Sequence, residues 1–97
     1  MSKKVRKEQF ASVWDAIEAS PALAENMKLR SVLMTALKNH ITRTEMSQVQ
    51  AAKLFGVTQP RVSDLMRGKI NLFALDALVT MTTAAGLRIE MRVRDAA

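Results

Sequence analysis

The sequence predicts one mainly α-helical domain of five to six helices, followed by a single β-strand at about residues 87–94. Three observations support this fold class. Ninety-seven residues suffice for one hydrophobic core but not for two. Apolar residues recur at helical spacing over most of the chain, and only three Gly and two Pro interrupt it. Residues 87–94 alternate apolar and charged side chains, which is typical of a half-buried strand.

The first predicted helix lies at Phe10–Ile17, where apolar residues stand at i, i+3, i+4 and i+7. The second begins at Ser20-Pro21, because serine caps a helix start and proline suits the first helical position. It is predicted to run from about Pro21 to Asn39. Its apolar stripe consists of Leu29, Val32, Leu33, Ala36, Leu37 and Ile41. A later helix begins near Leu75 and is expected to stop at Gly86.

The charge balance favours a polyanionic partner. Lys and Arg total 15 against nine Asp and Glu, which gives a net charge of +6. Four basic residues within Met1–Lys7 predict a flexible basic arm over residues 1–9, so residues 10–97 form the single predicted domain. No apolar run reaches the roughly 20 residues that a membrane span needs. We therefore expect a cytoplasmic protein.

Catalytic chemistry has no support in the sequence. The chain has no cysteine, which excludes disulfides and thiolate metal sites, and its one histidine, His40, has no second metal ligand type nearby. We find no Gly-rich phosphate loop and no nucleophile–base pair. The sequence therefore predicts neither an enzyme nor a cofactor.

The block Gln48–Arg67 has the pattern of two short helices that cross around a tight turn. Ala52 supplies a small side chain where the helices touch, and Gly56 tolerates the positive φ that the turn requires. Ser47 and Gln50 form a capping box, and Thr58 is the expected cap of the second helix. The predicted helices are Ser47–Phe55 and Gln59–Arg67, which together make a helix-turn-helix.

The outward residues of this block suit double-stranded DNA. In a helix-turn-helix, the N-terminal part of the second helix meets base edges in the major groove. Gln59 is predicted to contact adenine, Arg61 guanine and Asp64 cytosine, with Ser63 as a less selective reader. A phosphate contact by Arg61 stays open. The predicted phosphate contacts are Arg43, Ser47, Gln48, Thr58, Arg67 and Lys69.

The alternating tail needs a partner, because a lone strand leaves its backbone groups unpaired. The simplest partner is the same strand of a second copy of this chain. We therefore expect a homodimer in which the tails pair. The strand residues that face inward are Leu87, Ile89, Met91 and Val93.

Residues 47–69, SQVQAAKLFGVTQPRVSDLMRGK, resemble the phage-repressor and Cro-like (XRE) helix-turn-helix family. The resemblance extends over about residues 10–94, and its flanks are similar to a subgroup of HigA-type antitoxins. It implies a lambda-repressor-like DNA-binding fold and a dimer on a palindromic operator. Two positions depart from the family pattern: Ala74 stands where a capping Ser is usual, and Met46-Ser47 replaces Leu-Thr.

The resemblance also implies a function. It predicts a sequence-specific transcriptional regulator that represses its own operon and, as an antitoxin, neutralises a RelE/HigB-like toxin. The alternative is a stand-alone XRE-type repressor without a toxin. The candidate toxin contacts are the basic arm and the Phe10–Ile17 helix. RNA binding is disfavoured, because the chain has only four aromatic residues on which bases can stack.

Overall fold

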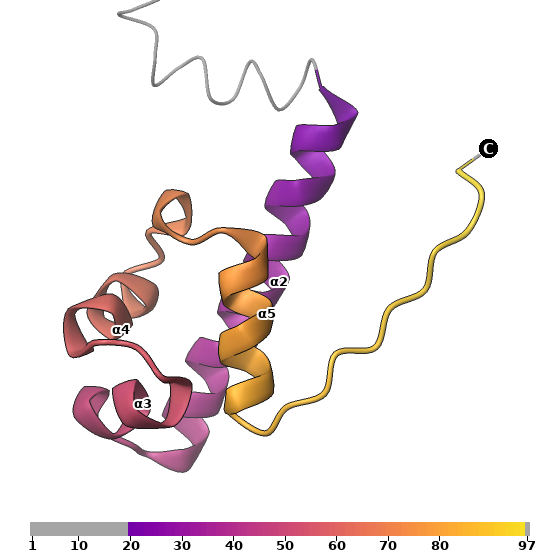
Figure 1. Cartoon of the computed structure of the whole chain (residues 1–97). Helices are drawn as coiled ribbons and strands as arrows, with labels where there is room; N and C mark the ends of the chain where they lie inside the picture. Colours follow the sequence, from indigo (N-terminus) through magenta and orange to yellow (C-terminus); the bar gives the residue numbers. More distant parts are fainter. Residues whose placement is uncertain (1–19, 97) are drawn as a thin grey trace, which may run out of the picture.

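The computed structural model of the protein describes residues 20–96. They form the helices α2 (Pro21–Thr44), α3 (Gln48–Phe55), α4 (Gln59–Met66) and α5 (Leu75–Ala84), with a short 3-10 turn, η3 (Ile70–Leu72), before α5. The long helix α2 packs along α5, while α3 packs against α4 and α5 (Figure 1). The helix-turn-helix pair therefore rests on a two-helix support. Within the described part of the chain, no helix is long and apolar enough to cross a membrane.

Helix α2 begins as its sequence predicts. The Ser20 hydroxyl accepts a hydrogen bond from the Leu23 N–H at 3.2 Å, and proline occupies the first turn. The predicted end at Asn39 is five residues too early, because the helix continues to Thr44. Ile41 is buried in the core, and the turn that carries it stays helical. The chain leaves the helix only at Glu45, which has a positive φ of 52°.

The core lies where α2, α3, α4 and α5 meet. Its largest fully buried side chains come from three helices and from the residue that follows η3, and they are Leu37, Val62, Leu65, Phe73, Leu78 and Met81. The predicted apolar stripe of α2 is confirmed at Leu33, Leu37 and Ile41. It is wrong at Val32, whose side chain is 59% exposed. The buried face of α2 instead includes Met34, one turn before Leu37.

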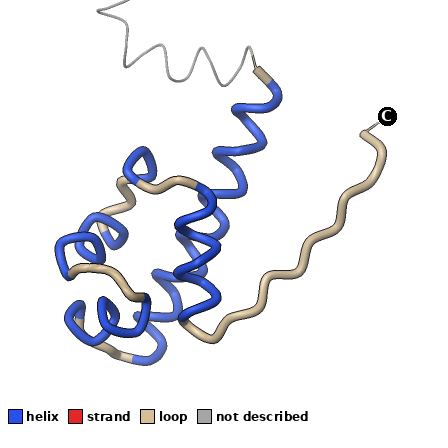
Figure 2. Tube along the Cα trace, viewed as in Figure 1, coloured by secondary structure: helices blue, strands red, loops and turns tan. Residues whose placement is uncertain are grey.

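The predicted strand at about residues 87–94 is wrong for the single chain. After α5 the chain runs out as an extended loop, and residues 20–96 contain no strand (Figure 2). A strand requires a neighbouring segment for its hydrogen-bond ladder, and the described residues of this chain supply none. Leu87 and Ile89 pack partly buried against the core, whereas Met91 and Val93 are 70% and 85% exposed.

The prediction of five to six helices covers the whole chain, and the described residues hold four α-helices and one 3-10 turn. The 3-10 turn was not predicted. The predicted basic arm and the predicted helix at Phe10–Ile17 lie outside the described residues, so the division into residues 1–9 and 10–97 stays a prediction.

Candidate nucleic-acid interface

The turn between α3 and α4 has the geometry that its residues predict. The Ser47 hydroxyl accepts from the Gln50 N–H at 3.1 Å, and the Gln50 side chain accepts from the Ser47 N–H at 2.8 Å, which confirms the capping box. Gly56 ends α3 with a φ of 74°, in the left-handed region that favours glycine. Ala52 is buried, and its carbonyl accepts the N–H groups of both Gly56 and Val57. These contacts fix how α4 leaves α3.

Helix α4 is anchored on one side only. Val62 and Leu65 are fully buried, while Gln59, Pro60 and Arg67 are exposed. Thr58 occupies the cap position with extended backbone angles, but its side chain makes no capping hydrogen bond. Pro60 occupies the first turn, where a missing N–H costs no helical bond. The first turn of α4 is therefore free to meet a ligand.

Two predicted contact residues are joined to each other across the turn. The Gln59 Nε2 donates to the Gln48 Oε1 at 2.5 Å, which links the first turn of α4 to the first turn of α3. This bond uses one of the two Nε2 hydrogens. The other hydrogen and the Gln59 Oε1 stay available, and a bidentate contact with adenine needs one donor and one acceptor. Gln48 therefore orients Gln59 without consuming the groups that read a base.

Arg61 does not share the exposed face of Gln59. It stands four residues before Leu65, on the side of α4 that turns toward η3. Its Nη1 donates to the Leu72 carbonyl at 2.7 Å, and its guanidinium carbon lies 4.2 Å from the centroid of the Phe73 ring. The predicted contact of Arg61 with guanine stays untested, but in this structure the side chain is bound to its own domain.

Asp64 and Lys69 also pair with each other. The Lys69 Nζ lies 3.7 Å from the Asp64 carboxylate, and the Lys69 N–H donates to the Asp64 carbonyl at 3.1 Å. The pair places a cation beside a carboxylate that would otherwise repel nearby phosphates. Ser63 lies half-buried one residue before Asp64. The roles predicted for these three residues stay predictions.

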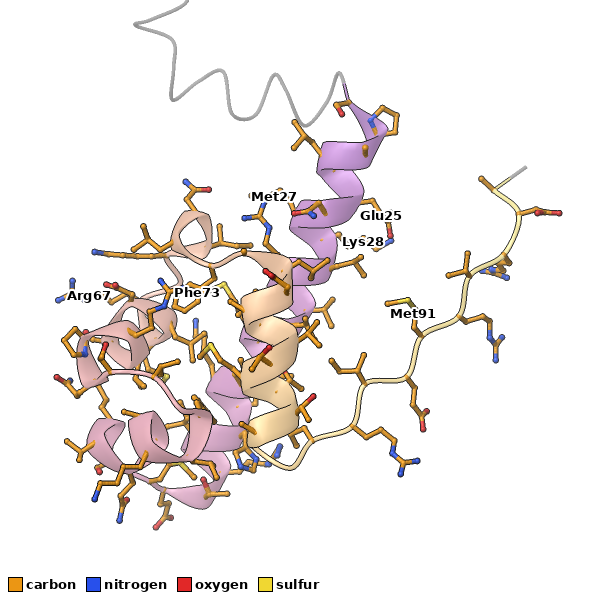
Figure 3. All side chains as sticks on the ribbon, in the orientation of Figure 1. Glu25, Met27, Lys28, Arg67, Phe73 and Met91 are labelled. Atoms are coloured by element: carbon orange, nitrogen blue, oxygen red, sulfur yellow. The ribbon has the colours of Figure 1, made fainter. Side chains whose placement is uncertain are left out.

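The remaining predicted phosphate contacts lie at the ends of three different helices. Arg67 is exposed at the end of α4 (Figure 3). Arg43 lies in the last turn of α2, where its guanidinium is 3.5 Å from the His40 Nδ1. Thr58 and Ser47 are exposed at the starts of α4 and α3. Arg67 and Thr58 thus lie at opposite ends of α4.

Sequence reasoning missed the residues that hold η3. The Arg30 Nη1 donates to the carbonyls of Ile70 and Phe73 at 3.3 and 3.4 Å, and Arg30 comes from α2. A signal was present, because Arg30 stands four residues before the buried Met34 and so continues the buried stripe. Lys38 was also missed: a Cβ built on Gly68 would lie 3.9 Å from its Nζ, so this cation lies beside the end of α4.

The described residues contain no group of three His, Asp or Glu side chains placed to hold a metal ion. Residues 47–69 therefore present a short helix, α4, whose exposed start is held by the hydrogen bond from Gln59 to Gln48 and whose end carries the exposed Arg67. This arrangement defines a helix-turn-helix protein.

Comparison with known proteins agrees with that class. The chain belongs to the helix-turn-helix domain family, whose model matches residues 16–94. It is similar to a solved structure described as an XRE-family transcriptional regulator, with 33% sequence identity and a TM-score of 0.68. The match covers 74% of this chain and 81% of that chain, which makes this an XRE-type helix-turn-helix protein and not an enzyme. No curated protein sequence matches the chain.

Proposed function

We propose that the protein is a DNA-binding transcriptional regulator that inserts the first turn of α4 into the major groove. The observation that carries this proposal is the Gln48–Gln59 hydrogen bond at the exposed start of α4. It prepares one side chain for a base edge while the turn at Gly56 sets the helix angle. The solved XRE-family structure supports the same role, because it is described as a transcriptional regulator.

The residues of the proposed interface divide by position. Gln59 reads a base, with Ser63 and Asp64 following it along α4. Pro60, exposed beside Gln59, offers an apolar surface of the kind that meets a thymine methyl group. The phosphate contacts are Ser47 and Gln48 at the start of α3, Thr58 and Arg67 at the ends of α4, and Lys69 and Arg43 beside them.

Selection of bound sites from random DNA duplexes tests this proposal. We expect one recurrent sequence, arranged as two half-sites whose centres lie about 34 Å apart, one turn of DNA, because a dimer presents two copies of α4. Competition with unrelated duplex DNA separates specific from non-specific binding. Failure to enrich any sequence would overturn the proposal.

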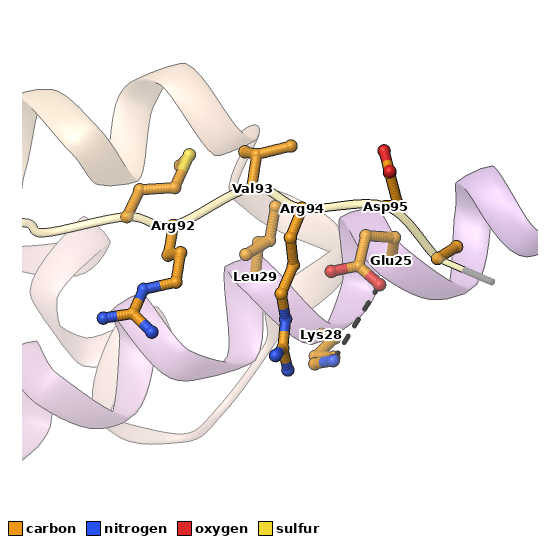
Figure 4. A pocket seen from close by; sticks show the side chains of 9 residues that line it. Glu25, Lys28, Leu29, Arg92, Val93, Arg94 and Asp95 are labelled. Atoms are coloured by element: carbon orange, nitrogen blue, oxygen red, sulfur yellow. Dashed lines mark ion pairs between the residues drawn. The ribbon is translucent and has the colours of Figure 1, made fainter.

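A homodimer is the second part of the proposal, and it is supported by the tail. Met91 and Val93 expose apolar side chains on an extended segment whose backbone has no neighbouring strand among the described residues. The tail and the N-terminal half of α2 border an open groove of about 780 Å³, with Leu29 on the α2 side and Val93 on the tail side (Figure 4). The Leu87–Val93 segment of a second copy would supply the missing neighbour.

The antitoxin role is narrower and is supported by the resemblance of the sequence alone. Its candidate contact segments, Met1–Lys7 and Phe10–Ile17, lie outside the described residues. A neighbouring gene that encodes a small basic RelE-like protein would favour it, and co-expression should then relieve the growth arrest that this toxin causes. Without such a gene, the stand-alone XRE-type repressor is favoured.

A further inference from the structure

We propose that Arg61 is a positioning residue that sets the orientation of α4 on DNA, and that it does not read a base. The inference rests on the proposed DNA-binding role of α4. The observation behind it is the direction of the Arg61 side chain. Arg61 belongs to the helix proposed to meet DNA, yet its Nη1 donates to the Leu72 carbonyl at 2.7 Å. Its guanidinium carbon lies 4.2 Å from the centroid of the Phe73 ring.

The two partners of Arg61 differ in burial. The Phe73 ring is fully buried in the core, whereas Leu72 is 48% exposed. The carbonyls of η3 and Phe73 are held from the other side by Arg30 of α2, which donates to Ile70 and Phe73. The Ile70 carbonyl also accepts the Phe73 N–H, whereas the donors to the Leu72 and Phe73 carbonyls are the side chains of Arg61 and Arg30. Through η3, Arg61 therefore connects α4 to the α2–α5 support.

Helix α4 needs such a connection. It has only eight residues. Val62 and Leu65 are its fully buried side chains, and Met66 packs partly buried against the core. None of the three lies among its first three residues, so the start of α4 depends on polar contacts with other elements: Gln59 to Gln48 of α3, and Arg61 to Leu72 of η3. The Arg61 contact is the one that reaches the buried core.

A positioning role and a base-reading role predict different effects on specificity. If Arg61 orients α4, its loss weakens every base contact together and leaves the preferred sequence unchanged. If Arg61 reads guanine, its loss relaxes the preference at one base pair and leaves the others intact. A charge-keeping variant is a necessary control, because removal of a cation also weakens phosphate binding.

The test uses the full chain and three variants, Arg61→Ala, Arg61→Lys and Phe73→Leu, with sites selected from random duplexes for the wild type. We expect Arg61→Ala to lose about fivefold or more in affinity for the selected site, because every base contact of α4 weakens together. Its base preferences should stay those of the wild type. Arg61→Lys keeps the charge but lacks the planar group that stacks, so it should also lose specific affinity while its affinity for unrelated duplex DNA stays near the wild-type value.

Coupling between Arg61 and Phe73 supplies a second readout. In the Phe73→Leu background, Arg61→Ala should lose less specific affinity than it does in the wild type, because the ring that holds the guanidinium is already gone. Should Phe73→Leu fail to fold, the base preferences of the two Arg61 variants still decide the question. All affinities are measured far below the thermal unfolding midpoint of each variant.

Two results would overturn this inference and leave the proposed function standing. One is a relaxed preference at a single base pair in Arg61→Ala. The other is a ratio of specific to non-specific affinity in Arg61→Ala that equals the wild-type ratio. The second would assign Arg61 to stability only. A wild-type protein that selects no sequence would instead overturn the proposed function, and this inference with it.

Discussion

The Arg61 guanidinium lies over the Phe73 ring, 4.2 Å from its centroid, and joins the exposed helix of the helix-turn-helix to a fully buried aromatic residue. A cation over an aromatic face contributes about 0.5–2 kcal/mol, depending on how far it is desolvated. The contact gives a basic residue of the proposed DNA-binding helix a role within the domain. The proposed base-reading surface of α4 then centres on Gln59 and its neighbours.

The positive φ of Gly56 predicts a stability loss in Gly56→Ala. A Cβ built there meets no atom within 4 Å, so the loss arises from the backbone angle of 74° and not from a clash. We expect the free energy of unfolding to fall by about 1–2 kcal/mol in thermal or urea denaturation. Gly56→Asn is the matched control, since asparagine tolerates this region better and should lose less. Equal stability of Gly56→Ala and the wild type would contradict the assigned turn geometry.

The cap residues of α3 and α4 are predicted to contribute differently to the free energy of unfolding. Ser47→Ala removes the hydroxyl that accepts from the Gln50 N–H, and we expect a loss of about 1 kcal/mol in the free energy of unfolding. Thr58→Ala is the control, because the Thr58 side chain makes no capping bond, and its loss should be smaller. Urea denaturation of both variants measures the difference. The assignment fails if Thr58→Ala is the more damaging change.

The proposed phosphate contacts predict that DNA affinity falls with salt, and that removing one contacting cation changes the slope of this fall. Figure 3 shows Arg67 and Lys28 on opposite sides of the domain, with Arg67 at the end of α4. The slope of log affinity against log salt should fall by about one unit in Arg67→Ala, because one phosphate contact is lost. Lys28→Ala should keep the wild-type slope. Equal changes in the two variants would indicate a response to net charge and no defined docking face.

The exposed tail predicts the dimer interface. Met91→Asp combined with Val93→Asp places two charges on the segment proposed to pair with a second copy, so we expect a shift from dimer to monomer in sedimentation equilibrium. Val49→Asp is the matched control: Val49 is also an exposed apolar residue, but it belongs to α3. A tail variant that stays dimeric would place the interface elsewhere, and a monomeric wild type would contradict the proposed dimer.

Local chemistry explains which elements the sequence predicts well. The capping box at Ser47, the turn at Gly56 and the buried positions Val62 and Leu65 each depend on residues close in the chain, and all are found as expected. The end of α2 was placed too early, at Asn39, although the predicted apolar stripe already continued to Ile41, which is buried in the core.

Contacts between distant parts of the chain also decide the surroundings of Arg61 and of the tail. The guanine contact predicted for Arg61 stays untested, and the sequence spacing of Arg61 to Leu65 already places it beside the core. The Leu72 carbonyl that binds it belongs to a 3-10 turn with no clear sequence signal. The alternating pattern of Leu87–Val93 indicates a segment able to pair, but a strand requires a second segment, and pattern alone does not supply one.

The central claim is that the start of α4 lies in the major groove and that Gln59 reads a base there. Replacing a single adenine of the selected site by 7-deazaadenine removes the major-groove acceptor N7 and leaves base pairing intact. At the adenine read by Gln59, we expect the wild-type protein to lose at least about fivefold in affinity, the smallest effect of one good base contact. Gln59→Ala should bind the two duplexes equally. If no adenine position shows this difference between the two proteins, the claim is contradicted.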